Sequence, residues 1–215
     1  EEKDARRHGK FLAFSGQVYS NFREDKHVIP PIHPKELQGT TLVVGMDHGF
    51  RNPTAFLFAT LDADGVLKIF HEHYKSEWTI DRHAAEVLEF LDTYDLNVSY
   101  FVGDPAIAQR NGQTGMSIQE EYSAQGIPIV LGVKDVKLGI DRVRHYLDEN
   151  KLLICSNCQE LIKELRGYRW APKSKSNRNT DPREAVAKYK DHAVDALRYL
   201  IVSRPENDTG TVSEE

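Results

Sequence analysis

Three acidic segments of this chain could together hold divalent metal ions. Asp47 follows the apolar run LVVGM, Asp104 follows YFVG, and Asp195 lies in the segment DHAVDALRYL near the C-terminus. Carboxylate oxygens suit Mg²⁺ and Mn²⁺, and crowded carboxylates raise one another's pKa unless a cation lies among them. Two such ions about 4 Å apart can activate a water molecule and stabilise the leaving oxygen in phosphodiester hydrolysis. These residues are therefore candidate ligands of a two-metal hydrolytic site.

The C-terminal segment leaves open which side chains would contact metal. On a helix, Asp191 and Asp195 are four residues apart and His192 and Asp195 three apart, so either pair can converge on one face. We favour His192 and Asp195, with Asp191 as a neighbouring or alternate ligand. Asp195 would stand mid-helix, where a carboxylate gains nothing from the helix dipole. Asp191 could also be a cap, and His192 a partner on the helix surface.

The elements that must position these residues can be predicted from the apolar pattern. Apolar runs at 40–46, 54–60 and 66–74, with Asp-Gly in LDADG between the last two, predict a three-stranded antiparallel meander. Further strands are expected at 98–102, IPIVLG and LLI, and helices over 79–94, 117–126, 136–150, 156–167 and from about 190 to 202. Thr79 could cap the first helix, and Ser117 with Glu120 forms a capping box.

This order of elements predicts an α/β fold, a mixed sheet with helices on both faces. If the first and fourth strands are adjacent and parallel, Asp47 and Asp104 lie side by side at the carboxyl edge, where open sheets bind ligands. The segments YRW and AVAKY are expected to pair around a basic loop. Residues 1–40, which contain VIPPIHP and GQVYSNF, are interpreted as an arm with a short hairpin, and 204–215 as a disordered acidic tail.

Composition excludes several classes of protein. The 215 residues are 40% hydrophobic and 28% charged, ordinary values for a globular protein, and no apolar run is long enough to span a membrane. The N-terminus also lacks the apolar region of a signal peptide. Cys155 and Cys158 form one CxxC without a second ligand pair, which favours two reduced thiols. His71 and His73 share a strand face but lack a third zinc ligand nearby in sequence.

Charge is distributed unevenly along the chain. The net charge is −5, yet residues 166–190 contain eight Lys/Arg and two Asp/Glu, a local balance of +6 that leaves −11 for the rest. Such a basic strip can contact backbone phosphates, although a solvated loop is an alternative. The candidate DNA-binding residues are Arg169, Lys173, Lys175 and Arg178 in the strip, with Arg51, Lys134 and Lys137 near the strand ends.

The motifs GMDHGFRNPTA, FVGDPA and DHAVDALRYL, in this order and with GQVYSNF before them, resemble the nuclease domain of large terminase subunits from tailed bacteriophages. The resemblance covers most of residues 10–203. It implies an RNase H-like fold over 41–203 and an endonuclease that cuts concatemeric double-stranded viral DNA with Mg²⁺ or Mn²⁺. It places catalysis on Asp47, Asp104 and the last helix. Relatives often have two adjacent aspartates where this chain has Asp191 and His192.

The resemblance also implies partners and a location. They are DNA, the small terminase subunit and the capsid portal, in the cytoplasm of an infected bacterium. Family members carry an ATPase motor before the nuclease, but this chain has no G-x-x-x-x-G-K-[ST] loop, so we expect a nuclease fragment that binds no ATP. The alternatives are a junction resolvase or transposase of the same fold, and a non-catalytic module that grips DNA or the portal.

Overall fold

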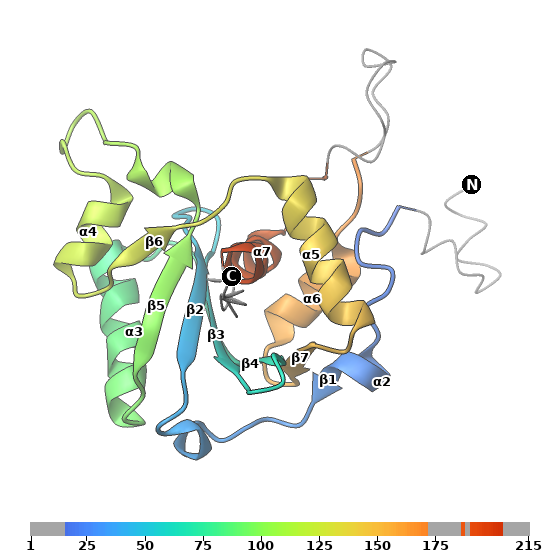
Figure 1. The fold of residues 1–215 in the computed structure, drawn as a ribbon. Helices are drawn as coiled ribbons and strands as arrows, with labels where there is room; N and C mark the ends of the chain where they lie inside the picture. Colours follow the sequence, from blue (N-terminus) through green and yellow to red (C-terminus); the bar gives the residue numbers. More distant parts are fainter. Residues whose placement is uncertain (1–15, 172–185, 188–189, 204–215) are drawn as a thin grey trace, which may run out of the picture.

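The computed structural model describes residues 16–171, 186–187 and 190–203. These residues form one seven-stranded mixed sheet with strand order β1-β7-β4-β3-β2-β5-β6 (Figure 1). The strands are β1 (Val28–Ile29), β2 (Leu42–Asp47), β3 (Thr54–Leu61), β4 (Leu67–Lys75), β5 (Val98–Gly103), β6 (Ile129–Leu131) and β7 (Leu152–Cys155). The helices are α2 (Glu24–His27), α3 (Ile80–Thr93), α4 (Ile118–Ala124), α5 (Val136–Asp148), α6 (Gln159–Gly167) and α7 (His192–Val202), with short 3-10 helices η1 (Pro34–Leu37) and η2 (Pro105–Ala108).

The predicted antiparallel meander is confirmed, because β3 pairs with β2 on one side and with β4 on the other. Its second turn is held by Asp62, whose Oδ1 accepts hydrogen bonds from the N–H groups of Asp64 and Val66. Gly65 has a φ of +77°, a conformation that glycine adopts without steric cost. The Asp-Gly pair in the sequence is thus a sound signal of a tight turn.

The two strands that end at aspartates are neighbours, as predicted. β5 runs parallel to β2 with Met46 opposite Gly103, so Asp47 and Asp104 follow these paired positions at the same edge of the sheet. β6 adds to β5 and β7 adds to β4, both in parallel. Helical crossovers between parallel strands are what place helices over the faces of such a sheet.

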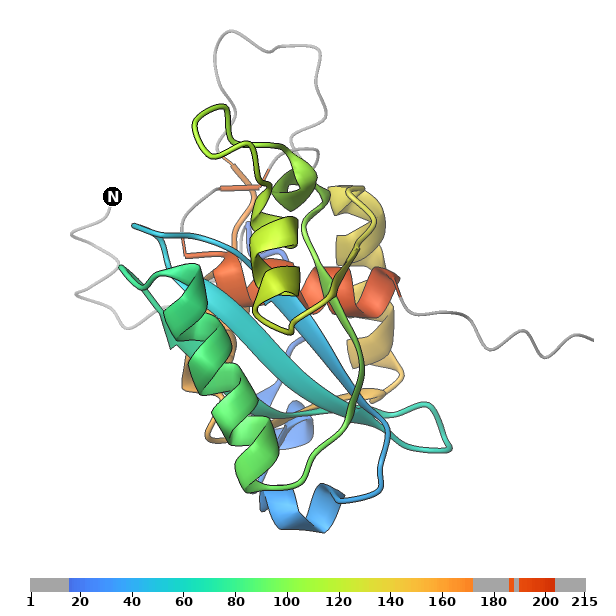
Figure 2. The same ribbon diagram turned by 90° about the vertical axis from the view of Figure 1, so that its left-hand side faces the viewer.

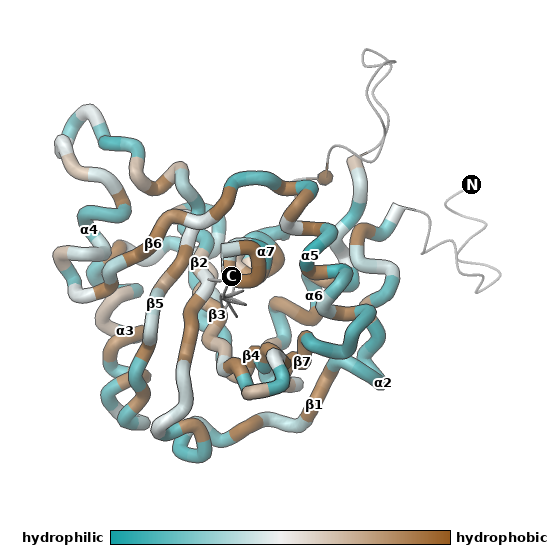
Figure 3. Tube along the Cα trace, viewed as in Figure 1, coloured by the Kyte–Doolittle hydropathy of each residue, from teal (hydrophilic) through white to brown (hydrophobic). Residues whose placement is uncertain are grey.

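Helices cover both faces of the sheet, which confirms the predicted fold class. Figures 1 and 2 show α3 and α4 on one face and α5, α6 and α7 on the other. Hydrophobic residues concentrate along the strands and α7, and hydrophilic ones on the outer helices (Figure 3). Eight of the eleven residues of α7 are buried, so this helix forms the centre of its layer.

Close packing of α7 on β2 depends on Gly45. A Cβ atom at this position would lie 2.4 Å from the carbonyl oxygen of Ala196 and 2.8 Å from Cβ of Leu200. A second close approach joins α5 to α7, where Gly139 faces the side chain of Arg198. The two glycines let α7 sit directly against the sheet on one side and against α5 on the other.

The predicted starts of two helices need correction. Thr79 occupies the N-cap position of α3 without a capping hydrogen bond from its side chain. α6 begins at Gln159 rather than near Ser156, because its first N–H groups bond to Glu72 of β4, which accepts from Glu160 N (2.8 Å) and Leu161 N (3.0 Å). A cap supplied by a distant strand leaves no local signal in the sequence. The Ser117–Glu120 capping box of α4 is confirmed.

The described part of the expected arm, residues 16–40, packs against the domain. Val18 and Tyr19 are fully buried, and β1 adds to the edge of the sheet beside β7. Among the described residues no hairpin is seen near GQVYSNF, and Gln17 instead forms an antiparallel bridge to Arg169. The domain boundary at residue 40 stays a prediction. Cys155 and Cys158 are buried free thiols, as expected.

The expected pairing of YRW with AVAKY is confirmed by an antiparallel bridge between Trp170 and Val186. Most of the basic loop between them, with Lys173, Lys175 and Arg178, lies outside the described residues, as does the tail 204–215. None of the described helices is both long enough and apolar enough to cross a bilayer.

Candidate metal centre

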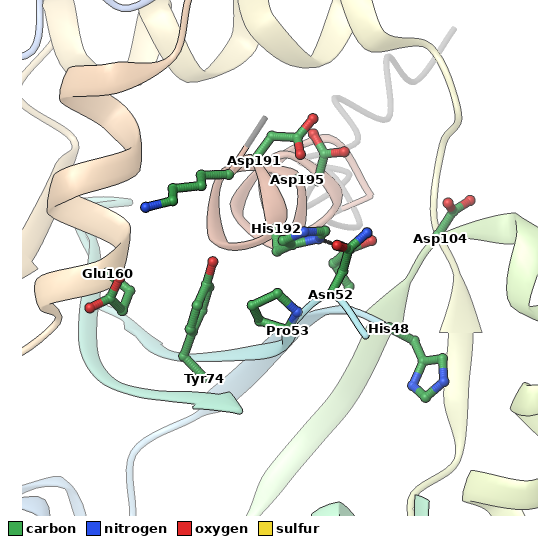
Figure 4. Close-up of a pocket in the computed structure, with 11 residues that line it drawn as sticks. His48, Asn52, Pro53, Tyr74, Asp104, Glu160, Asp191, His192 and Asp195 are labelled. Atoms are coloured by element: carbon green, nitrogen blue, oxygen red, sulfur yellow. Dashed lines mark hydrogen bonds and ion pairs between the residues drawn. The ribbon is translucent and has the colours of Figure 1, made fainter. Parts of the chain in front are cut away.

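All five predicted metal ligands line a single cavity of about 660 Å³ at the carboxyl edge of the sheet (Figure 4). Asp47 is the last residue of β2, and Asp104 follows β5. Asp191, His192 and Asp195 come from the start of α7, which lies across the same edge. The other lining residues are His48, Asn52, Pro53, Tyr74, Glu160 and Lys190.

Asp47 and His192 are in direct contact. Nδ1 of His192 lies 2.8 Å from Oδ2 of Asp47, so the imidazole donates its Nδ1–H to the carboxylate. Burial raises the pKa of Asp47 above its usual value, although the bond from His192 acts in the opposite direction. The same bond raises the pKa of His192. This contact joins the end of β2 to the first turn of α7 and fixes the orientation of the histidine ring.

Asp195 is held by a buried arginine of its own helix. Nη2 of Arg198 lies 3.0 Å from Oδ1 of Asp195, an ion pair that lacks the geometry of a directed hydrogen bond. Arg198 is only 2% exposed, and its Nε and Nη1 have no hydrogen-bond partner among the described residues. Burial raises the pKa of Asp195 to about 6, with Arg198 opposing the shift and Asp47 adding to it.

The remaining two aspartates have different surroundings. Asp104 caps η2, where its Oδ1 accepts a hydrogen bond from Ala106 N at 2.8 Å. Asp191 stands at the N-cap position of α7 but makes no capping hydrogen bond with its side chain. In Figure 4, Asp191 and Asp195 project from one side of α7, whereas His192 points from the other side toward Asn52. Which of the three α7 residues would contact metal stays a prediction.

The donor set fits hard divalent cations. The four predicted aspartates and the imidazole of His192, all on one cavity, match the oxygen-rich ligands that Mg²⁺ and Mn²⁺ prefer. As placed, no three His, Cys, Asp or Glu side chains in the described part of the chain converge on one point as closely as metal binding requires. Like charges repel one another, which favours spread-out carboxylates. Metal binding at this site would therefore need side-chain rotation.

The loop after Asp47 is closed by hydrogen bonds of its own, and the ring of His48, next to Asp47, contacts Tyr122. His48 turns its ring away from α7 (Figure 4), with Nδ1 at 3.1 Å from the Tyr122 hydroxyl. The Thr54 hydroxyl donates to the Gly49 carbonyl at 2.6 Å and accepts from Gly49 N at 3.1 Å. These bonds close the β2–β3 loop tightly beside the cavity.

Several residues of the cavity wall were not identified from the sequence. Tyr74 and Glu160 enter from β4 and α6, elements whose placement beside α7 no local pattern indicates. Lys190 was counted only as part of the basic strip, but it lines the cavity with a φ of +51°, a conformation uncommon outside glycine. The only sequence feature that points to Lys190 as a cavity residue is its position directly before Asp191 and the apolar helix.

Four of the seven predicted DNA-binding residues fall within the described part of the chain, and the other three lie outside it. Arg51 is exposed in the β2–β3 loop, Lys134 follows β6, Lys137 is in the first turn of α5, and Arg169 is in the segment that bridges Gln17. None of these four lines the cavity. Their role in DNA binding stays a prediction.

The known proteins that this chain resembles are large terminase subunits of bacteriophages. No known family model matches the chain. It is 27% identical over 207 residues to the large terminase subunit of Escherichia phage T5, an alignment that covers 90% of this chain and 43% of that protein. The chain thus spans less than half the length of this relative.

Solved structures of terminases share the fold. The large terminase of a thermophilic bacteriophage, solved in complex with ADP, superposes with a TM-score of 0.72 at 24% identity, over 86% of this chain and 44% of that one. The P22 large terminase nuclease domain gives 0.66 at 20% identity, over 86% and 90%. The large terminase nuclease of thermophilic phage G20c, solved with bound cobalt, gives 0.61 at 17% identity, over 86% and 96%. The chain is therefore similar in sequence to a phage large terminase subunit, and its described part has the RNase H-like fold of the terminase nuclease domains.

Proposed function

We propose that this chain is the endonuclease domain of a DNA-packaging terminase, which cuts concatemeric double-stranded DNA by metal-dependent hydrolysis. The observation that carries the proposal is the convergence of Asp47, Asp104 and the acidic start of α7 on one cavity. Structures of the G20c nuclease with bound cobalt and with bound magnesium support the binding of a divalent cation by a domain of this fold.

Asp47, Asp104 and Asp195 would hold two Mg²⁺ or Mn²⁺ ions, with His192 as a further ligand and Asp191 as a neighbouring or alternate one. When bound, such ions lower the pKa of water and neutralise charge on the phosphoryl group. The chain's own residues orient this set. Asp47 fixes the ring of His192 at 2.8 Å, and Arg198 holds Asp195 at 3.0 Å.

Binding of the duplex would depend on cations around the acidic cavity. Arg51, Lys134, Lys137 and Arg169 are exposed on the described surface, and the basic loop with Lys173, Lys175 and Arg178 follows Trp170. Such residues contact phosphates and carry no sequence information by themselves. By relation to terminases, the further partners are the small terminase subunit and the capsid portal, in the cytoplasm of the infected host. We expect no ATP site in this chain.

Plasmid nicking with Mn²⁺, Mg²⁺ or chelator tests the proposal. Asp47→Asn and Asp104→Asn should each abolish cleavage and keep the native circular dichroism spectrum. Asp64→Asn, in the exposed β3–β4 turn, is the matched control and should cut normally. Full activity in either cavity variant would remove that residue from the mechanism. Cleavage restricted to four-way junctions would indicate a resolvase, and a chain that neither binds Mn²⁺ nor cuts would indicate a docking module.

A further inference from the structure

The first turn of α7 does not use a cap from its own segment. The first N–H groups of any helix lack intrahelical acceptors, and an N-cap side chain usually supplies one. Asp191 occupies the N-cap position of α7, but its side chain accepts no capping hydrogen bond. The acceptor comes instead from α6, where Oε2 of Glu164 receives the N–H of Val194 at 3.0 Å. Glu164 also interacts with the N–H of Ala193.

Glu164 is enclosed, and both of its oxygens have partners. It is only 4% exposed, although a glutamate in the middle of a surface helix usually faces solvent. Its second oxygen, Oε1, accepts a hydrogen bond of 2.6 Å from the hydroxyl of Tyr74 on β4. Tyr74 itself lines the candidate metal cavity. One carboxylate therefore links β4, α6 and the start of α7 at the wall of the cavity.

The position of this carboxylate matters for the neighbouring ligands. Val194 N lies between His192, which contacts Asp47, and Asp195, which contacts Arg198. The N-terminus of a helix carries partial positive charge, which disfavours a cation beside it. A carboxylate bonded to the first-turn N–H groups offsets that charge. Glu164 thus fixes the position of the turn that carries the ligands and offsets the partial positive charge of its N–H groups.

We propose that Glu164 is a positioning residue of the metal centre, which caps α7 from a neighbouring helix and sets the place of His192 and Asp195. The inference rests on the proposed metal-dependent function and adds to it a residue with no metal contact of its own. Glu164 is 28 residues before His192 in sequence, and none of the motifs around the predicted ligands includes it.

The test is calorimetric titration of the whole chain with Mn²⁺. Glu164→Gln keeps the shape of the side chain but loses its charge and one of its two acceptors. It should bind Mn²⁺ about 10- to 100-fold more weakly, the usual effect of removing a residue that orients metal ligands. Hydrogen exchange of the Val194 amide should become faster in the same variant.

Ser117→Ala is the matched control, because it removes the cap of α4, which carries no predicted ligand. It should lose a comparable amount of stability and keep the native Mn²⁺ affinity. If Glu164→Gln does not fold, Glu164→Asp takes its place, since it keeps the charge but shortens the side chain by one methylene and so draws the carboxylate away from Val194 N. Mn²⁺ binding should then weaken less, but measurably.

Equal Mn²⁺ affinity in the unmodified chain and in folded Glu164→Gln would overturn the inference while leaving the metal site intact. With Glu164→Asp as the substitute, unchanged affinity would have the same consequence. If the unmodified chain binds no Mn²⁺, the proposed metal-dependent function itself fails, and the inference fails with it.

Discussion

Substitution of Gly45 by alanine would test whether the packing of α7 on β2 sets the metal centre. The new Cβ would lie 2.4 Å from the carbonyl oxygen of Ala196 and 2.8 Å from Cβ of Leu200. The first neighbour is backbone and the second is the root of a side chain, so no rotamer change relieves the clash. Either α7 or β2 must move.

The size of the movement follows from the distances. Since Cβ atoms keep at least 3.0 Å from other heavy atoms, a separation of 2.4 Å requires a shift of at least 0.6 Å. Overpacking of this kind costs about 1–3 kcal/mol of unfolding free energy. Ala196 follows Asp195, and Asp47 is two residues beyond Gly45, so the shift separates the predicted ligands. Metal sites tolerate only about 0.2 Å in their ligand distances.

Urea unfolding with and without Mn²⁺ measures both effects. Gly45→Ala should be less stable by about 1–3 kcal/mol and should gain less from Mn²⁺ than the unmodified chain does. Gly112→Ala is the control, since a Cβ there meets nothing within 4 Å. The reasoning is refuted if Gly45→Ala unfolds within about 0.5 kcal/mol of the unmodified chain, the range of a neutral surface change, and keeps its full response to Mn²⁺.

Three further predictions follow from the site and its surroundings. Asp195→Asn should lower stability by up to about 3 kcal/mol, because it leaves the buried Arg198 cation unpaired; thermal melting should also show no stabilisation by Mn²⁺, whereas Asp191→Asn should keep part of it. Replacing Lys173, Lys175 and Arg178 together with alanine should flatten the plot of log K for duplex DNA against log salt by about 0.9 for each phosphate that the variant no longer neutralises; an unchanged slope would show that these side chains do not bind DNA. Burial lowers the pKa of His71, His73 and His83 to about 4, so the unfolded chain binds more protons below its own histidine pKa of about 6.5. Stability should be complete above that pH and fall toward pH 4, by up to about 1.4 kcal/mol per pH unit for each independent histidine; His83→Gln should give a shallower dependence in urea unfolding, and an identical one would contradict the assignment.

Local patterns in the sequence predicted the frame of the site well. Asp47 and Asp104 were recognisable because each ends a short apolar run, and strands of this kind place their next residue at the edge of a sheet. The contact between His192 and Asp47 joins residues 145 apart in sequence. Only the packing of α7 on β2 in the folded chain reveals it.

The interactions that position α7 could not be predicted, because their partners lie far apart in sequence. In sequence, Glu72 and Glu164 look like ordinary charged residues of a strand and a helix. In the structure, Glu72 caps the start of α6 and Glu164 caps the start of α7. Asp195 was expected to stand mid-helix, but α7 begins at His192, so Asp195 lies in the first turn, where a carboxylate is favoured. Its ion-pair partner Arg198 fits in the interior because Gly139 of α5 leaves room for the side chain.

Folding and metal binding should be coupled in this domain, because α7 is located by several elements at once. Gly45 allows the close distance between α7 and β2, and Glu164 accepts a hydrogen bond from the first turn of α7. The side chain of Arg198 packs against Gly139 of α5. The same packing buries Asp47 and Asp195 and raises the pKa of both, which means that their ionised forms carry a desolvation cost in the folded protein. A ligand that binds only the folded state stabilises it. A divalent cation that offsets the buried charges should therefore raise the stability of the native chain, and least in variants that loosen α7.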